Sequence, residues 1–170
     1  MGFTTVPTVA TNDPWTAAQH NQFIRDNFAA VRPDTGIAKR SATQSIPNTT
    51  KTAISLDVED DDTANFFDIV GQPTRLSFPY TGVFFVTVTA DFASNATGRR
   101  ELGVEPAGGG VQDIGTNLNA VNGTNTQLHA VIITKRSGGD FYEAFVTQNS
   151  GGALNLSAGK ISVATLRDDS

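Results

Sequence analysis

Cysteine is absent from this 170-residue chain, and methionine, tryptophan and histidine are scarce, with one, one and two residues. The missing cysteine excludes disulfide bonds, thiolate nucleophiles and cysteine-ligated zinc sites. Charged residues make up only 17% of the chain, against about 25% in typical soluble domains. No apolar run approaches the roughly 20 residues that span a bilayer, and the N-terminus lacks the basic and apolar regions of a signal peptide. We therefore expect no membrane-spanning segment.

The acidic balance of the chain comes from one segment. There are 17 acidic and 12 basic residues, for a formal net charge of −5. Five of the acids fall within six positions: Asp57, Glu59, Asp60, Asp61 and Asp62. Without them, the acidic and basic residues balance. Nucleic-acid binding needs a basic stripe, and docking on anionic lipid needs a basic surface, so we expect neither partner.

The first 36 residues predict an extended arm followed by one helix. Residues 1–10 are uncharged and read as the arm. Asp13 is a good N-cap and Pro14 suits the first helical position, which predicts a helix from Trp15 to about Val31. Pro33 ends it, because proline cannot continue a helix.

The predicted helix has an apolar side, formed by Phe23, Ile24, Phe28 and Val31. A single helix of four to five turns cannot bury such a side by itself. It must pack on the following domain, on copies of itself or on another protein, and the sequence leaves these alternatives open.

From Ile37 onward the apolar residues follow the period of two that is typical of strands. Short strands separated by turns are expected at 52–58, 66–70, 75–78, 83–92, 101–104, 127–134, 141–147 and 161–166. About eight strands at spacings of roughly 8–12 residues indicate an all-β sandwich or barrel. The chain is therefore divided into an N-terminal region, 1–36, and a β domain, 37–170.

Two parts of the chain resemble known families. Residues 65–68 (Asn-Phe-Phe-Asp) and 78–86 (Phe-Pro-Tyr-Thr-Gly-Val-Phe-Phe-Val) resemble the C1q/TNF-like jelly roll, as do the turns and strand starts at 139–143 and 148–152. Residues 13–27 look like a leader segment of tailed-bacteriophage virion proteins. Together these resemblances imply a jelly-roll knob of about eight or more strands on the surface of a phage particle.

The family's assembly, as the resemblance implies, is a compact trimer that buries one face of the sandwich. Phe85, Phe141 and Phe145 lie opposite the core-facing residues of their strands. Aromatic rings on the second face of a strand would leave an apolar patch that soluble monomers usually avoid. These three residues are the candidates for the trimer interface; the alternative is that they pack under loops or against the helix.

The five clustered acids are the best candidates for metal chemistry. Ca²⁺ takes six to eight oxygen ligands, and some C1q-like trimers bind it, so Asp57, Glu59, Asp60, Asp61 and Asp62 are weak calcium candidates. The favoured interpretation is a solvated acidic loop without an ion. No other cofactor is expected.

The two histidines, His20 and His129, lie far apart in the sequence, and no nucleophile elbow, Walker loop or Rossmann fingerprint is present. The expected function is therefore a non-enzymatic virion protein, a capsid decoration or head-fibre knob. Its partners would be itself, as a homotrimer, and the major capsid protein or another virion protein. The candidates for anchoring are Trp15, Phe23, Ile24 and Phe28. The alternative is a tail-fibre or tail-tip protein that binds carbohydrate on the host surface.

Overall fold

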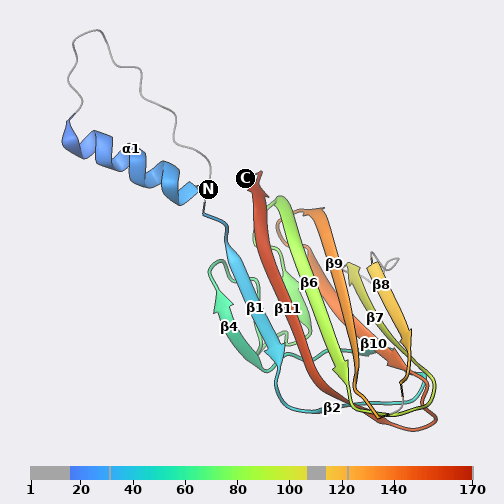
Figure 1. Cartoon of the computed structure of the whole chain (residues 1–170). Helices are drawn as coiled ribbons and strands as arrows, with labels where there is room; N and C mark the ends of the chain where they lie inside the picture. The colour runs from blue at the N-terminus through green and yellow to red at the C-terminus, as the bar shows by residue number, and fades with distance from the viewer. Residues whose placement is uncertain (1–15, 31, 107–113, 122, 170) are drawn as a thin grey trace.

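A computed structural model describes residues 16–30, 32–106, 114–121 and 123–169 (Figure 1). This part of the chain contains one helix and eleven strands. They are α1 (Ala17–Ala30), β1 (Thr35–Arg40), β2 (Gln44–Ile46), β3 (Thr52–Ala53), β4 (Val58–Asp62), β5 (Arg75–Ser77), β6 (Gly82–Phe92), β7 (Arg99–Pro106), β8 (Ile114–Asn119), β9 (Thr126–Arg136), β10 (Phe141–Gln148) and β11 (Leu154–Asp168).

Helix α1 begins with a capping box. The Thr16 hydroxyl accepts a hydrogen bond from the Gln19 amide at 3.2 Å, and the Gln19 side-chain carbonyl accepts one from the Thr16 amide at 3.0 Å. This reciprocal pair satisfies two of the free amides of the first turn. The expected cap, Asp13 with Pro14, lies outside the described residues. Among those residues, no helix has the length and apolar character needed to cross a membrane.

The strands form two antiparallel sheets packed face to face. Sheet A has the order β4-β1-β11-β6-β9, and β2 also pairs with β11. Sheet B has the order β3-β10-β7-β8, and β5 also pairs with β10. Apart from β7 and β8, the neighbours within each sheet are not consecutive strands, so the chain repeatedly crosses between the layers. The all-β jelly-roll prediction is confirmed, and Figure 1 shows α1 standing apart from the sandwich.

The core lies between the sheets and is rich in aromatic rings. Phe78 packs on Phe84 with ring centroids 4.7 Å apart, and on Tyr142 at 5.4 Å. Phe66 meets Phe84 edge-on at 6.1 Å. Along β6, alternate side chains from Phe84 to Phe92 are buried, as the sequence predicts. This alternation fixes which side chains face outward on the opposite side of sheet A.

The segment predicted as one strand at 52–58 changes sheets instead. The Ile54 amide donates to the Ala144 carbonyl of β10 in sheet B, whereas the Asp57 amide donates to the Lys39 carbonyl of β1 in sheet A. Ile54 and Leu56 remain buried, as expected. The expected strand at 66–70 is also absent: Phe66 and Phe67 are buried, but neither lies in a strand, and the Phe66 carbonyl accepts a single hydrogen bond from the Ser77 amide of β5 at 2.8 Å.

The last strand is much longer than the sequence predicts, because β11 pairs with three others, β1, β2 and β6. Strands β1, β2 and β8 were not individually predicted. Because β1 begins at Thr35, the expected division between residues 36 and 37 falls inside a strand, and the sheet starts two residues earlier.

Candidate functional site

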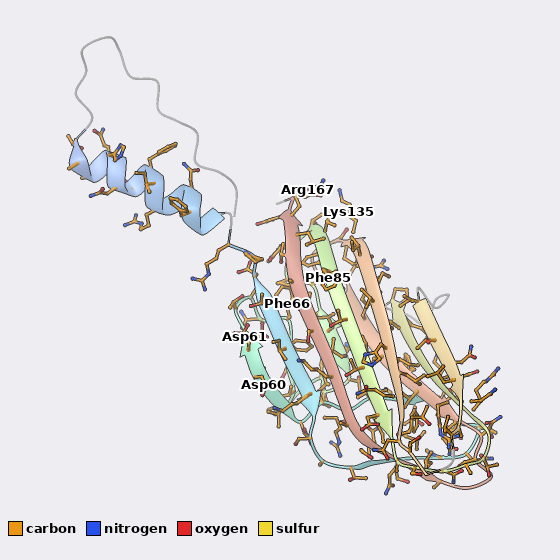
Figure 2. All side chains as sticks on the ribbon, viewed as in Figure 1. Asp60, Asp61, Phe66, Phe85, Lys135 and Arg167 are labelled. Atoms are coloured by element: carbon orange, nitrogen blue, oxygen red, sulfur yellow. The ribbon has the colours of Figure 1, made fainter. Side chains whose placement is uncertain are left out.

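The outer face of sheet A carries an exposed apolar cluster. Phe85 on β6 lies directly opposite Ile133 on β9. Val131 lies two residues before Ile133 on the same strand and faces the same side of the sheet. Their exposed fractions are 36% for Phe85, 50% for Val131 and 64% for Ile133. Ala164 of β11 flanks Phe85 on its other side. We call Phe85, Val131 and Ile133 the sheet A patch; Figure 2 shows Phe85 within the sheet.

Charged and polar side chains surround the sheet A patch. At the end where β11 finishes, Asp169 accepts from Lys135 at 2.9 Å and from Arg167 at 2.6 Å (Figure 2). These two cations lower the pKa of Asp169, mainly through the hydrogen bond from Arg167. Further along the face, Thr87 and Thr89 point outward. An apolar centre within a polar rim is the usual anatomy of a protein–protein interface.

The other two trimer candidates lie on a different face. Phe141 and Phe145 belong to β10, on the outer side of sheet B. The guanidinium of Arg75 covers the Phe141 ring at 4.0 Å, and the ammonium of Lys51 covers the Phe145 ring at 4.2 Å. The structure therefore does not bring the three phenylalanines together. Each of the two rings on β10 already packs against a cation.

Carboxylates hold those two cations in place. Lys51 bonds Glu105 at 2.5 Å, and Glu105 is only 9% exposed. Glu143 lies between the two rings on β10, accepts from the Thr74 hydroxyl at 2.6 Å, and faces Arg75 at 3.8 Å. The outer face of sheet B is thus a charged layer over apolar rings, unlike the sheet A patch.

The acidic segment forms a strand, not the expected loop. Asp60 and Asp61 lie on β4, at the edge of sheet A (Figure 2). Asp60 pairs with Lys39 at 2.7 Å, and Asp61 accepts from the Thr35 hydroxyl at 2.6 Å. Glu59, in the same strand, is exposed. Acidic side chains along an edge strand discourage pairing with further strands.

The carboxylates at either end of this segment bind backbone amides. Asp62 accepts from the amides of Phe66 and Phe67, both at 2.8 Å, and so holds the buried turn against β1. Asp57 accepts from the amides of Ser41 at 2.7 Å and Ala42 at 3.0 Å, which lower its pKa. Among the described residues, no group of three or more His, Cys, Asp or Glu side chains is arranged to hold a metal ion.

The anchoring candidates lie on α1 or before it. Trp15 is outside the described residues. Phe23 is half-buried, Ile24 is 40% exposed and Phe28 is 71% exposed. The structure therefore leaves Ile24 and Phe28 accessible to a partner.

A polar hollow of about 200 Å³ lies where β7 begins and β10 ends, at the end of the sandwich opposite the start of β1 (Figure 1). It is lined by Thr49, Arg99, Glu101, Thr147, Gln148 and Asn149. Arg99 pairs with Glu101. Gln148 is almost fully buried and holds the base of the hollow by donating to the carbonyls of Ile46 at 3.0 Å and Gly152 at 2.7 Å.

Sequence reasoning missed the position of Val131 and Ile133 beside Phe85. Alternation along 127–134 places both opposite Leu128, Ala130 and Ile132, but their position next to Phe85 depends on the pairing of β6 with β9. The sequence signal that could have located them is that β6 and β9 each carry apolar side chains on both faces.

Neither the protein-family models nor the curated proteins include a match to this chain. Solved structures do match. The globular domain of zebrafish complement 1qA is 11% identical, with a TM-score of 0.58, covering 77% of this chain and 94% of that one. Murine APRIL is 10% identical, with a TM-score of 0.61, and the match covers 79% of this chain and 100% of that one. Eiger TNF from S. frugiperda is 9% identical, with a TM-score of 0.50, and the match covers 82% of this chain and 96% of that one. The chain therefore has the C1q/TNF-like jelly-roll fold.

Proposed function

We propose that this chain is a non-enzymatic, trimer-forming knob whose subunits meet through the outer face of sheet A. The observation that carries the proposal is the sheet A patch, where Phe85, Val131 and Ile133 lie exposed next to one another. Soluble monomers rarely leave such side chains contiguous in water. In a closed ring of three identical subunits, every subunit buries the same surface. The trimer implied by the sequence resemblance would therefore cover the sheet A patch on all three subunits.

Light scattering on the full chain tests the trimer. We expect three times the chain mass of 17.9 kDa at micromolar concentration. The double variant Phe85→Ser, Ile133→Ser should shift the protein to monomer. The matched control is Val70→Ser, which changes a side chain that is 91% exposed in a loop and should leave the trimer intact. A wild-type chain that scatters as a monomer would contradict the proposal.

We further propose that the trimer is a surface component of a bacteriophage virion, with a capsid decoration or head-fibre role favoured. The resemblance of residues 13–27 to phage leader segments supports this context. Helix α1 stands apart from the sandwich (Figure 1) and contributes no residue to its core, which supports attachment through the N-terminal region. Electron microscopy of particles made with and without the protein tests it. Particles made with the protein should show density for the knob on the capsid. If they show no such density on any part of the particle, the proposed virion role is wrong.

The polar hollow favours one alternative, a receptor-binding role on a tail fibre or tail tip. It lies at the end of the sandwich away from the proposed attachment, and its Arg99, Glu101 and Thr147 side chains offer donors and acceptors for sugar hydroxyls. Binding of purified host polysaccharide that is lost in Arg99→Ala would support this alternative. Absence of binding, together with less stable capsids on deletion of the protein, would remove it.

A further inference from the structure

One side of α1 carries residues at the spacing of a coiled-coil seam. Ala17, Asn21, Ile24 and Phe28 follow one another at intervals of four, three and four residues. These intervals place them on one stripe, as the two core positions of a heptad repeat. All four side chains are exposed in the single chain, including Phe28 at 71%. We call these four residues the α1 seam.

We propose that the three copies of α1 in the trimer associate in parallel through the α1 seam and form a short three-stranded stem above the knob. This inference rests on the trimer proposed above, and it assigns sister helices as the partner of Ile24 and Phe28. The candidates for the virion contact then narrow to Trp15 and Phe23. Phe23, adjacent to Ile24 in sequence, lies about 100° around the helix from it.

The connection between α1 and the sandwich favours sister helices over another partner. Helix α1 ends at Ala30 and β1 begins at Thr35, and the four residues between them span at most about 14 Å. Strand β1 belongs to sheet A, which also carries the sheet A patch. Trimerisation through that sheet therefore brings three helices together at one end of the knob.

The connection is also fixed at its sandwich end. The Asp34 carboxylate accepts from the Tyr80 hydroxyl at 2.7 Å, and the Asp34 carbonyl accepts from the Thr165 amide at 2.9 Å. A helix of 14 residues is marginal alone in water. Tethering on a trimer raises the effective concentration of each helix to about the millimolar range, which favours association of the three copies.

The residues of the α1 seam suit a specific association. Ile24 and Phe28 supply the apolar contacts, and Ala17 allows close approach. Asn21 is polar at a core position, and one such residue fixes the register of neighbouring helices. The only formally charged residue beside the seam is Arg25, which pairs with Asp26 of its own helix at 3.2 Å. Like charges therefore do not keep the helices apart.

The chain has no cysteine, so single cysteines report on the seam directly. In the full chain, Asn21→Cys places a thiol in the α1 seam, and Gln22→Cys places one at an exposed position about 100° around the helix, outside the seam and the capping box. Under mild oxidation, Asn21→Cys should form covalent dimers at least about tenfold faster than Gln22→Cys. Adding Ile24→Asp and Phe28→Asp to Asn21→Cys should remove this difference while the trimer persists by light scattering.

Two results would overturn the inference, and they are distinguishable. If the protein scatters as a trimer but the two cysteine variants cross-link at equal rates, the stem is wrong and the proposed trimer stands. If the cysteine variants and the wild-type chain all scatter as monomers, the trimer itself fails and the stem fails with it.

Discussion

At the scale of single residues, Tyr80 ties the start of the sandwich to its last strand. Its hydroxyl donates to Asp34 at 2.7 Å and lies 2.7 Å from the Thr165 hydroxyl of β11. Burial raises the pKa of Tyr80 to about 12, although the hydrogen bond with Thr165 lowers it. The proton on this phenol is therefore part of the folded structure.

Replacing Tyr80 by phenylalanine removes both hydrogen bonds and should lower the free energy of unfolding by about 1–2 kcal/mol at neutral pH. The dependence of the free energy of unfolding on pH is a more specific test of Tyr80. Below pH 10 both states keep the proton; between pH 10 and 12 the unfolded chain loses it first, so the stability of the wild type falls as pH rises. Urea unfolding across this range should show the fall in wild type and a smaller one in Tyr80→Phe. Parallel curves would refute the assignment.

Arg100 is a buried cation whose guanidinium donates hydrogen bonds to three backbone carbonyls. The side chain is fully buried, and it donates to the carbonyls of Thr97 at 2.9 Å, Asn95 at 3.2 Å and Arg99 at 3.3 Å. Burial lowers its pKa. The planar fork of the guanidinium reaches all three carbonyls at once, and so it holds the turn between β6 and β7.

Lysine cannot reproduce that fork, because its ammonium is a single point charge. Arg100→Lys should therefore lower the free energy of unfolding by about 2–4 kcal/mol. The neighbouring Arg99→Lys, at an exposed position, should change it by less than about 0.5 kcal/mol. Chemical denaturation of the two variants measures the difference. Equal effects would show that the three carbonyl contacts of Arg100 contribute little.

At the scale of elements, β1 is the strand on which the buried turn at 64–67 rests. A Cβ at Gly36 would lie 3.0 Å from ring atoms of both Phe66 and Phe67, and 3.1 Å from Val163. Asp62 holds the turn in this position through its two amide contacts. The absence of a side chain at position 36 is what lets two phenyl rings approach the sheet.

Alanine usually stabilises a strand relative to glycine, but at position 36 we expect the opposite. Gly36→Ala should lower the free energy of unfolding by about 1–3 kcal/mol, because the added methyl group overpacks the site. Gly152→Ala is the matched control, since its Cβ would meet no atom within 4 Å. Thermal unfolding of both variants tests this. A neutral Gly36→Ala would mean that the rings of Phe66 and Phe67 give way easily.

At the scale of the whole molecule, the sandwich is complete without α1. The buried core is drawn from the two sheets and the turns between them, and it contains no residue of the helix. Strand β1, in contrast, pairs with both β4 and β11 and buries Ala38. The first residue that the sandwich needs is therefore near Asp34.

A chain of residues 34–170 should fold, with slow amide hydrogen exchange in the central strands β6 and β11. A chain of residues 41–170 lacks β1, which exposes one edge of β11 and separates β4 from the sheet, and it should not fold cooperatively. Exchange followed by NMR distinguishes the two. Slow exchange in both truncations would contradict the role given to β1.

Local pattern predicted the parts of this fold that depend on neighbours in sequence. The alternation in β6 and β10 correctly separated core from surface, and the apolar side of α1 was visible in Ile24 and Phe28. What the sequence could not show was pairing between distant strands. Phe85 and Phe145 look alike along the chain, but only the strand pairing places Phe145 beneath Lys51 and leaves Phe85 beside Ile133.

The prediction of a loop at the acidic segment was wrong for the same reason. Its charges suggested a loop, yet Asp60 and Asp61 find Lys39 and Thr35 on a strand 20 or more residues away, and these contacts fix β4 at the sheet edge. Long-range partners decide the structure of a polar segment, and single-sequence patterns do not contain them.

The adjacency of the first and last strands has a practical consequence. Thr35, at the start of β1, pairs with Ala164, near the end of β11, so the chain enters and leaves the sandwich at one end (Figure 1). The turn at 149–153, between β10 and β11, lies at the opposite end. A foreign peptide inserted at Gly151 would point outward from whatever surface holds the helix, whereas one fused after β11 would point back toward that surface. The same scaffold thus offers an outward display position and an inward one for engineered cargo.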